Sequence, residues 1–259
     1  MIESFKNQKV KDLLKLREGK NRRKSGLILL EGDREIQRAL ANDFDLIELF
    51  ACTSKLSDLS REILESQSRD VRYVSEQVFE KIALRETVGG LLATAKPKYF
   101  SLSDLNMDRT GFYLLAERVE KPGNLGAILR TADGVGADAV ILLDQVTDVF
   151  NPNAIRSSLG AVFSVPTVSV TANEFIDFAK GHDIQLVSAS PFSDKVYTEV
   201  DYTQATALVF GSEAFGLSDI WKVEGESVKI PMLGICDSLN VSVSAAILAY
   251  EVLRQRSAN

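Results

Sequence analysis

Two polar residues in the segment 117–130 are the first in this 259-residue chain whose types and spacing could do chemistry. Asn124 follows a Pro-Gly turn at the start of a predicted helix, and Arg130 lies six residues later on that helix. The planar guanidinium of an arginine suits it to bind a phosphate, while the asparagine could orient a partner. The alternative is a capped helix with a surface arginine, because Asn is among the best N-cap residues.

A second polar loop, residues 208–218, follows an apolar strand. It places Glu213 between Gly211 and Gly216, at the point where the strand ends. The two glycines let the backbone bend sharply and approach a ligand closely. The loop therefore indicates either a ligand-facing carboxylate or a tight turn with an incidental acid.

The third polar loop, residues 234–240, precedes a helix that we predict over Val241–Arg256. Ser238 and Asn240 lie just before the helix begins, where either could cap it. The same side chains could instead present hydrogen-bond donors and acceptors to a ligand. The helix itself has few polar residues, which predicts burial on most of its circumference.

Six predicted strands in the second half of the chain alternate with helices. We expect strands at Phe112–Ala116, Ala139–Leu143, Val165–Val170, Ile184–Ser188, Ala207–Phe210 and Ser227–Ile230. We expect helices near Asn124–Gly134, Asn153–Leu159, Asn173–Lys180, after Leu217 and at Val241–Arg256. Because several strands are continuous apolar runs, they predict an α/β fold, a mostly parallel sheet with helices on both faces. Ligands of such sheets bind at the carboxyl ends of the strands, where all three polar loops lie.

The first half predicts a smaller α/β unit. Its strands are expected at Gly26–Glu31, Leu46–Ala51, Val71–Val74 and Gly90–Ala95, and its helices at Asp33–Ala41, Leu56–Glu65 and Glu76–Arg85. A polar, proline-containing stretch separates the halves. We therefore expect a first domain over 1–98, a linker over 99–110 and a second domain over 111–259.

Charge is unevenly distributed along the chain. Residues 1–26 contain nine basic and three acidic residues, a net of +6, whereas the whole chain has −6 and the remainder therefore −12. This excess could form a basic arm that neutralises phosphates of a nucleic acid. An amphipathic helix with Leu13, Leu14 and Leu16 packed down is the equally compatible alternative.

Composition excludes several classes of site. Cys52 and Cys236 are far apart, so neither a disulfide framework nor a zinc site is indicated, and each is typical of a small buried residue. With His182 as its one histidine, the chain favours neither a Ser/His/Asp triad nor a metal centre. No signal peptide or membrane span is predicted, which favours a cytoplasmic protein. The glycines at 134 and 136 enter a strand, so they do not match a dinucleotide-binding loop.

Three segments, in order and each after a strand, together carry a specific resemblance. NLGAILRTADGVGADAVIL, LVFGSEAFGLS and IPMLGICDSLNVSVSAAI closely resemble the three motifs of the SpoU (TrmH) family of RNA ribose 2'-O-methyltransferases. NPNAIRSSLGAVFSVP resembles the segment between the first two motifs. GLILLEGDREIQRAL resembles, more weakly, the start of the L30e-like substrate-binding domain that precedes the catalytic domain in many members.

The resemblance implies roles for particular residues. It implies catalytic roles for the five matched polar residues, Asn124, Arg130, Glu213, Ser238 and Asn240. It implies that S-adenosylmethionine contacts loops containing Ser190, Phe210, Gly211, Ser212, Ile230, Met232 and Leu239. It also implies a C-terminal trefoil knot and a homodimer that packs C-terminal helices together. No metal is implied, and we expect Arg22, Arg23 and Lys24 of the basic segment to contact RNA.

The resulting expectation is an S-adenosylmethionine-dependent RNA 2'-O-methyltransferase that acts on ribosomal RNA. A tRNA substrate, or a non-catalytic RNA-binding factor with the same fold, are the alternatives. A sulfonium methyl donor is already activated, so the enzyme must mainly align the methyl group with the ribose oxygen. Family accounts make the arginine the base, but a guanidinium keeps its proton, so we favour Arg130 as an electrostatic stabiliser of the forming oxyanion.

Overall fold

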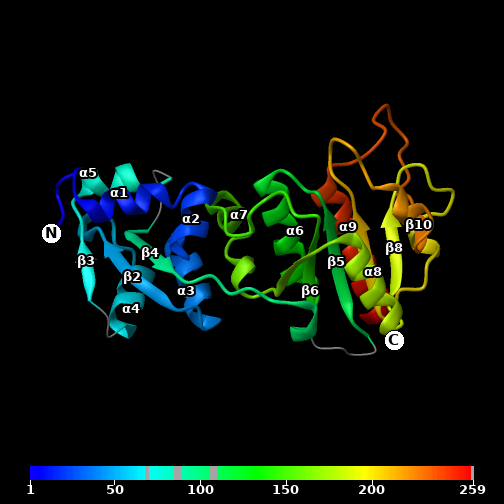
Figure 1. Cartoon of the computed structure of the whole chain (residues 1–259), viewed down its shortest axis with the longest axis horizontal. Coiled ribbons are helices and arrows are strands. Elements are labelled where there is room, and N and C mark those ends of the chain that lie inside the picture. Colours follow the sequence, from blue (N-terminus) through cyan, green and yellow to red (C-terminus); the bar gives the residue numbers. More distant parts are fainter. Residues whose placement is uncertain (68–69, 85–88, 106–109, 258–259) are drawn as a thin grey trace. The chain divides into compact units, whose positions relative to one another are not determined.

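The computed structural model describes residues 1–67, 70–84, 89–105 and 110–257, and the chain forms two compact units (Figure 1). The first unit contains Met1–Lys98 and Phe150–Ser164, and the second contains Tyr99–Val149 and Val165–Asn259. The segment Phe150–Ser164, which we expected inside the second domain, thus belongs to the first unit. Among the described helices, none has the length and apolar character needed to cross a bilayer.

A four-stranded sheet with the order β1-β4-β2-β3 forms the centre of the first unit. Its strands are β1 (Ile28–Glu31), β2 (Leu46–Ala51), β3 (Val71–Tyr73) and β4 (Leu91–Ala95). β4 pairs antiparallel with both neighbours, and β2 pairs parallel with β3. Besides two helices at the N-terminus, the unit contains α3 (Asp33–Ala41), α4 (Asp58–Ser66), α5 (Glu76–Ile82) and α7 (Pro152–Ser157). All four predicted strands are present, whereas the predicted end of the third helix, Arg85, lies outside the described residues.

The basic N-terminal segment folds into two helices, α1 (Gln8–Lys15) and α2 (Gly19–Ser25), which confirms the amphipathic-helix interpretation. Val10, Leu13 and Leu16 are buried against the core that includes α5. Arg17 donates hydrogen bonds to three carbonyls at the end of α5, those of residues 81–83, at 2.7 to 3.1 Å. Because this segment supplies core side chains, it is part of the folded unit and not a loose arm.

Arg22 does not present its charge at the surface. Only 4% of it is exposed, and its Nη1 donates to the carbonyls of Leu16 at 2.8 Å and Arg17 at 2.9 Å. Its guanidinium therefore joins α1 to α2, and we remove it from the expected RNA contacts. Arg23 and Lys24 are exposed.

A buried carboxylate joins two helix starts in the first unit. Asp33 is 7% exposed, and its Oδ2 accepts hydrogen bonds from Ser57 Oγ at 2.5 Å and Ser60 Oγ at 2.7 Å. Replacing Asp33 with alanine removes the acceptor of both hydroxyls, of which that of Ser60 is fully buried. We expect the free energy of unfolding to fall by about 1–3 kcal/mol in urea titrations. The control Glu62→Ala, an exposed change on α4, should stay within about 0.5 kcal/mol of the unaltered protein, and an equal loss in both variants would contradict the assignment.

A six-stranded sheet, all of it parallel, forms the centre of the second unit, as predicted, with the order β10-β8-β9-β5-β6-β7. Its strands are β5 (Phe112–Glu117), β6 (Ala139–Leu143), β7 (Thr167–Val170), β8 (Gln185–Ala189), β9 (Thr206–Phe210) and β10 (Glu226–Val228). Every residue of β5 is buried, as expected for a central strand covered on both faces.

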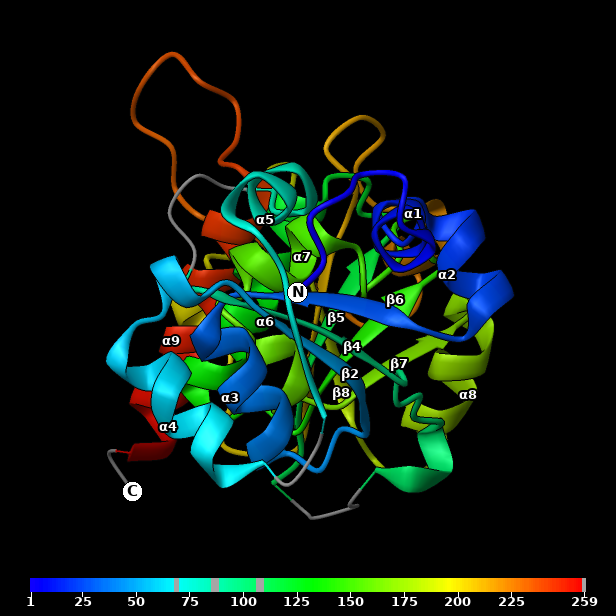
Figure 2. The ribbon, with the colours of Figure 1, turned by 90° about the vertical axis from the view of Figure 1, so that its left-hand side faces the viewer.

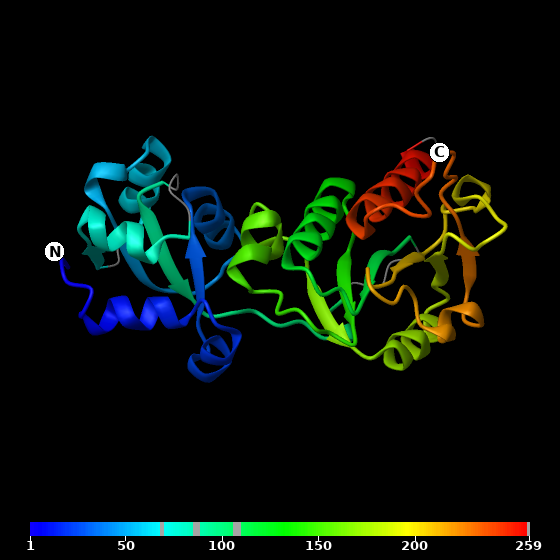
Figure 3. The same ribbon diagram turned by 90° about the horizontal axis from the view of Figure 1, so that it is seen from above.

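Helices cover both faces of this sheet (Figures 2 and 3). α6 (Pro122–Val135) and α9 (Val241–Ser257) pack against each other on one face, and α8 (Ala172–Gly181) lies on the other. Phe175, Ile176 and Ala179 of α8 share a core with β5 and β6. His182 follows α8, is exposed, and its Nδ1 lies 2.8 Å from the Phe178 carbonyl, as expected of a surface residue.

The polar loops after β5, β9 and β10 leave the same edge of the sheet, because the carboxyl ends of parallel strands lie together (Figure 1). β9 pairs directly with β5, which brings the second polar loop beside the first. Cys52 is buried as expected, but Cys236 in the third loop is exposed, so the prediction of burial was wrong for Cys236. The fold thus gathers the polar loops for a common site.

Candidate active site

Asn124 enters the site from the first turn of α6. The helix begins at Pro122, a favourable first residue, and Lys121 is the N-cap, so Asn124 is the third residue of the helix and does not cap it. The capping alternative for Asn124 was therefore wrong. Its side chain is free to reach across to the loop after β9, where its Nδ2 donates a hydrogen bond to Glu213 Oε1.

Glu213 projects from a tight turn that closes on itself. Ser212 N donates to the Gly216 carbonyl at 3.2 Å, and Gly216 N donates to the Ser212 carbonyl at 2.9 Å. Gly216 has a φ of +66°, and a Cβ on Gly211 would lie 2.3 Å from the carbonyl carbon of Gly216. Both glycines are required by this geometry, which leaves the exposed Glu213 at the tip of the turn.

Asn240 both caps α9 and contacts Asn124. Its Oδ1 accepts hydrogen bonds from Ser242 N at 3.0 Å and Ser242 Oγ at 2.7 Å, the pattern of an N-cap. Its Nδ2 donates to Asn124 Oδ1 at 3.3 Å. One amide thus starts the helix and joins the polar chain Glu213–Asn124–Asn240, which links all three loops.

Arg130 lies outside this polar chain. It is exposed on α6 and makes no hydrogen bond or ion pair within the described ranges. It lies six positions after Asn124 on the helix, which places the two side chains roughly 120° apart around the helix. A guanidinium in this position keeps all five of its donors available.

Ser238 lines a small cavity of about 50 Å³ at the carboxyl ends of β8 and β10. The lining residues are Ala189, Ser190, Pro191, Val228, Ile230, Met232, Asp237, Ser238, Leu239 and Ser244. Four residues predicted to bind the cofactor are among them: Ser190, Ile230, Met232 and Leu239. The other three, Phe210, Gly211 and Ser212, lie at the end of β9 and in the turn after it, outside the cavity.

The segment Ile230–Leu239, five of whose residues form one wall of the cavity, offers free backbone groups. No backbone hydrogen bond joins these ten residues to other described parts of the chain. Val228, Ile230 and Leu239 supply apolar surface beside the hydroxyls of Ser190 and Ser238. Apolar walls with a few hydrogen-bonding groups suit a small organic ligand with an apolar plane and polar edges, such as a nucleoside.

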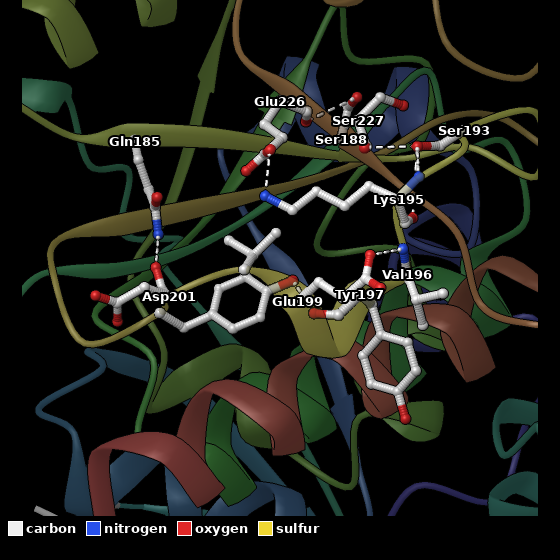
Figure 4. A network of polar contacts seen from close by, with 12 residues as sticks. Gln185, Ser188, Ser193, Lys195, Val196, Tyr197, Glu199, Asp201, Glu226 and Ser227 are labelled. Carbon is white, nitrogen blue, oxygen red and sulfur yellow. Dashed lines mark hydrogen bonds and ion pairs between the residues drawn. The ribbon is translucent and has the colours of Figure 1, made fainter.

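A network of polar contacts joins the segment after β8 to β10 (Figure 4). After the cavity-lining Pro191, Ser193 Oγ donates to the Ser227 carbonyl at 2.6 Å, and Lys195 Nζ lies 2.5 Å from Glu226 Oε1. Lys229 N donates to the Lys195 carbonyl at 2.8 Å. These contacts hold the segment after β8 beside β10, next to Pro191 and Ile230 of the cavity.

One buried acid beside the site was not selected from the sequence. Glu117, the last residue of β5, is 1% exposed and accepts two hydrogen bonds from Ser218. Its signal in the sequence is an acidic residue that directly ends a continuous apolar strand. Of the described residues, no three or more His, Cys, Asp and Glu are grouped as metal ligands would be.

Comparison with family models assigns both halves of the chain. Residues 111–250 match the model described as the SpoU rRNA Methylase family. Residues 7–93 match the model described as an MRM3-like substrate binding domain. The first match covers all three polar loops.

Relatives with known names match nearly the whole chain. The 23S rRNA (guanosine(2553)-2'-O)-methyltransferase RlmP of Bacillus subtilis is 32% identical over 97% of this chain and 98% of its own. A crystal structure of an RNA 2'-O ribose methyltransferase is 38% identical, with a TM-score of 0.90 and 99% of each chain covered. The SpoU methyltransferase AviRb from Streptomyces viridochromogenes, solved with the cofactor AdoMet, is 28% identical with a TM-score of 0.88, over 98% of this chain and 100% of its own.

Proposed function

Because the chain belongs to the SpoU rRNA Methylase family, we propose that it transfers a methyl group from S-adenosylmethionine to a ribose 2'-hydroxyl of ribosomal RNA. The observation that carries the proposal is the polar chain Glu213–Asn124–Asn240, made from the three loops that hold the family motifs. The relative from Bacillus subtilis, named for this reaction on 23S rRNA, matches almost from end to end.

The types of residue that line the small cavity match the chemistry of S-adenosylmethionine, a molecule that would fill this cavity and extend beyond its volume of about 50 Å³. The adenine and ribose of this molecule need apolar contact together with hydrogen-bond donors and acceptors, which the segment Ile230–Leu239 supplies through its free backbone groups. In the proposal, the cofactor is held by Ser190, Ile230, Met232 and Leu239. The side of the site nearest β9 is formed by Phe210, Gly211 and Ser212. When bound, S-adenosylmethionine supplies an activated methyl group.

The protein contributes mainly alignment and electrostatic stabilisation to such a transfer. Asn124, Glu213 and Ser238 position the ribose, and Asn240 fixes Asn124. Arg130 stabilises the negative charge that develops on the ribose oxygen as its proton passes to solvent water. Its guanidinium has no partner within the described residues, so it is available for this charge or for the neighbouring phosphate.

We further propose a cytoplasmic homodimer that carries the family knot and needs no metal. Val243 and Tyr250 of α9 are 45% and 53% exposed, although this helix is otherwise largely covered. Two exposed apolar side chains seven residues apart lie on one side of a helix. This side of α9 is the surface that we assign to the second copy.

Incubation with labelled S-adenosylmethionine and separated rRNA and tRNA tests the proposed function. We expect label in rRNA at a linkage that resists alkali, because 2'-O-methylation removes the hydroxyl that alkaline cleavage needs. Label found only in tRNA would show that the substrate is tRNA and not rRNA. Binding of RNA without any transfer, and without binding of S-adenosylmethionine, would identify a non-catalytic RNA-binding factor.

Arg23 and Lys24 remain the expected phosphate contacts of the first unit. The slope of log K against log salt is negative for RNA binding, and each lost phosphate contact makes it less steep by roughly one. Replacing both residues with alanine should therefore reduce the steepness by about 1–2. Filter binding of the rRNA substrate across salt concentrations measures this slope. The control is Lys180→Ala with Lys222→Ala, two exposed lysines paired with Glu224 and Asp219. A slope that the Arg23 and Lys24 changes leave untouched would remove both residues from the RNA interface.

A further inference from the structure

Glu117 is a carboxylate that the fold keeps almost entirely away from solvent, with 1% exposed. Its Oε2 accepts a hydrogen bond from Ser218 N at 2.8 Å, and its Oε1 accepts one from Ser218 Oγ at 2.5 Å. Arg118 Nη2 lies 3.9 Å from Oε2, at the limit of an ion pair. Burial of a carboxylate is unfavourable unless its oxygens are paired, so both oxygens depend on this contact with Ser218.

The contact fixes the far end of the turn that carries Glu213. The near end continues β9, whose pairing with β5 holds it in place. Between the ends, the mutual hydrogen bonds of Ser212 and Gly216 make the turn a closed unit. Ser218 is the first residue after this unit that hydrogen bonds to another element, and the element is the end of β5.

Glu117 also begins the connection that leads to Asn124. β5 ends at Glu117, and α6 starts five residues later at Pro122. The same residue therefore holds the turn of Glu213 and directly precedes the loop that delivers Asn124. Glu117 therefore helps to position both partners of the Asn124–Glu213 hydrogen bond.

We propose that Glu117 is a positioning residue for methyl transfer, which holds Glu213 against Asn124 by binding Ser218. The inference rests on the proposed function and adds a residue to it. Glu117 is buried, so it acts through Ser218 and does not touch the RNA. Neither Glu117 nor Ser218 lines the cavity, and the pairing of β9 with β5 holds the near end of the turn, with Phe210 to Ser212, in place without them. Loss of the Glu117–Ser218 contact should therefore lower kcat and leave the affinity for S-adenosylmethionine unchanged.

Four variants test this inference. In Glu117→Gln, the amide oxygen can accept from Ser218 N and the amide nitrogen can donate to Ser218 Oγ, so kcat should stay within about threefold. In Glu117→Leu, both contacts are lost and kcat should fall on the order of 100-fold, as misplacement at an active site does. Ser218→Ala keeps the backbone N–H that donates to Glu117, so its kcat should fall less than that of Glu117→Leu. Combining Glu117→Gln with Ser218→Ala removes the acceptor of the glutamine nitrogen, so kcat should fall by more than the product of the two single-variant losses.

The measurements separate positioning from general damage. Calorimetric titration should give the same Kd for S-adenosylmethionine, within about threefold, in all four variants, since a threefold change is under about 1 kcal/mol. Full kcat in Glu117→Leu would overturn the inference, and so would a Glu117→Gln variant as inactive as Glu117→Leu, because hydrogen bonding would then not be what matters. If Glu117→Leu fails to fold, the double variant decides in its place, and additive losses in that variant would overturn the inference.

A readout without catalysis distinguishes this inference from the proposed function. Hydrogen exchange at the Ser218 amide should be faster in Glu117→Leu than in the unaltered protein, because the amide has lost its acceptor. If the unaltered protein transfers no methyl group, the proposed function fails, while faster exchange in Glu117→Leu still supports the contact between Glu117 and Ser218. Unchanged exchange at the Ser218 amide would overturn the inference about Glu117 even if the protein is active.

Discussion

Arg130→Ala is expected to lower the rate of methyl transfer by at least about 100-fold, since removal of one oxyanion-stabilising donor typically has an effect of this size. The fold should not change, because Arg130 is exposed on α6 and contacts no other side chain in the described part of the chain through a hydrogen bond or ion pair. The affinity for S-adenosylmethionine should also hold, because Arg130 does not line the cavity that we propose for the cofactor. Single-turnover transfer to rRNA, with thermal unfolding and cofactor titration, measures the three quantities.

Two companion variants make the result specific to the guanidinium. Arg61→Ala removes an exposed arginine of α4 in the first unit and should leave the rate of transfer unchanged. Arg130→Lys keeps the charge but loses the planar fork of donors, so we expect it to recover only part of the rate. Full activity in Arg130→Ala would remove Arg130 from the mechanism.

The second unit could be predicted from the sequence because its strands are continuous apolar runs. β5 and β6 are buried at every position, which is the pattern that indicated a parallel sheet with two covered faces. Parallel strands place their carboxyl ends at one edge, so the sequence also predicted that the polar loops share an edge. The hydrogen bonds between the loops could not be predicted, because they depend on β9 lying beside β5, and local sequence does not specify strand order.

The deviations have physical causes that a linear pattern does not contain. Asn124 has the type of a cap, but Pro122 starts α6 two residues earlier because its fixed φ favours the first helical position. Arg22 lies in a basic run, yet two carbonyls at the end of α1 bind its guanidinium. The segment Phe150–Ser164 resembles an ordinary crossover in sequence, and only its tertiary contacts assign it to the first unit.

Asn240 was ambiguous in the sequence between a helix cap and a site residue, and the structure gives its amide both contacts. The oxygen binds the first turn of α9 and the nitrogen binds Asn124. Because the two functions use different atoms, one substitution can separate them. Aspartate keeps the oxygen that caps the helix and removes the nitrogen that donates to Asn124.

Asn240→Asp is therefore expected to keep the stability of the protein and lose its activity. Aspartate caps helices as well as asparagine does, and its charge is favourable at a helix start, so the free energy of unfolding should change by less than about 0.5 kcal/mol. A carboxylate facing Asn124 Oδ1 should turn that amide around and break its bond to Glu213, which we expect to lower kcat by about 10–100-fold. Urea unfolding and steady-state transfer to rRNA measure the two effects.

Two controls bracket this result. Asn240→Ala removes both contacts and should lose about 1 kcal/mol of stability as well as activity. Thr171→Ala removes the cap of α8, where Thr171 Oγ1 accepts from Glu174 N at 3.3 Å, and should lose similar stability with full activity. Normal activity in Asn240→Asp would show that Asn240 serves only the helix. A helix cap alone would change only the stability, and a site contact alone would change only the activity. Loss of both in Asn240→Asp would therefore mean that the start of α9 and the polar chain Glu213–Asn124–Asn240 form one structural unit.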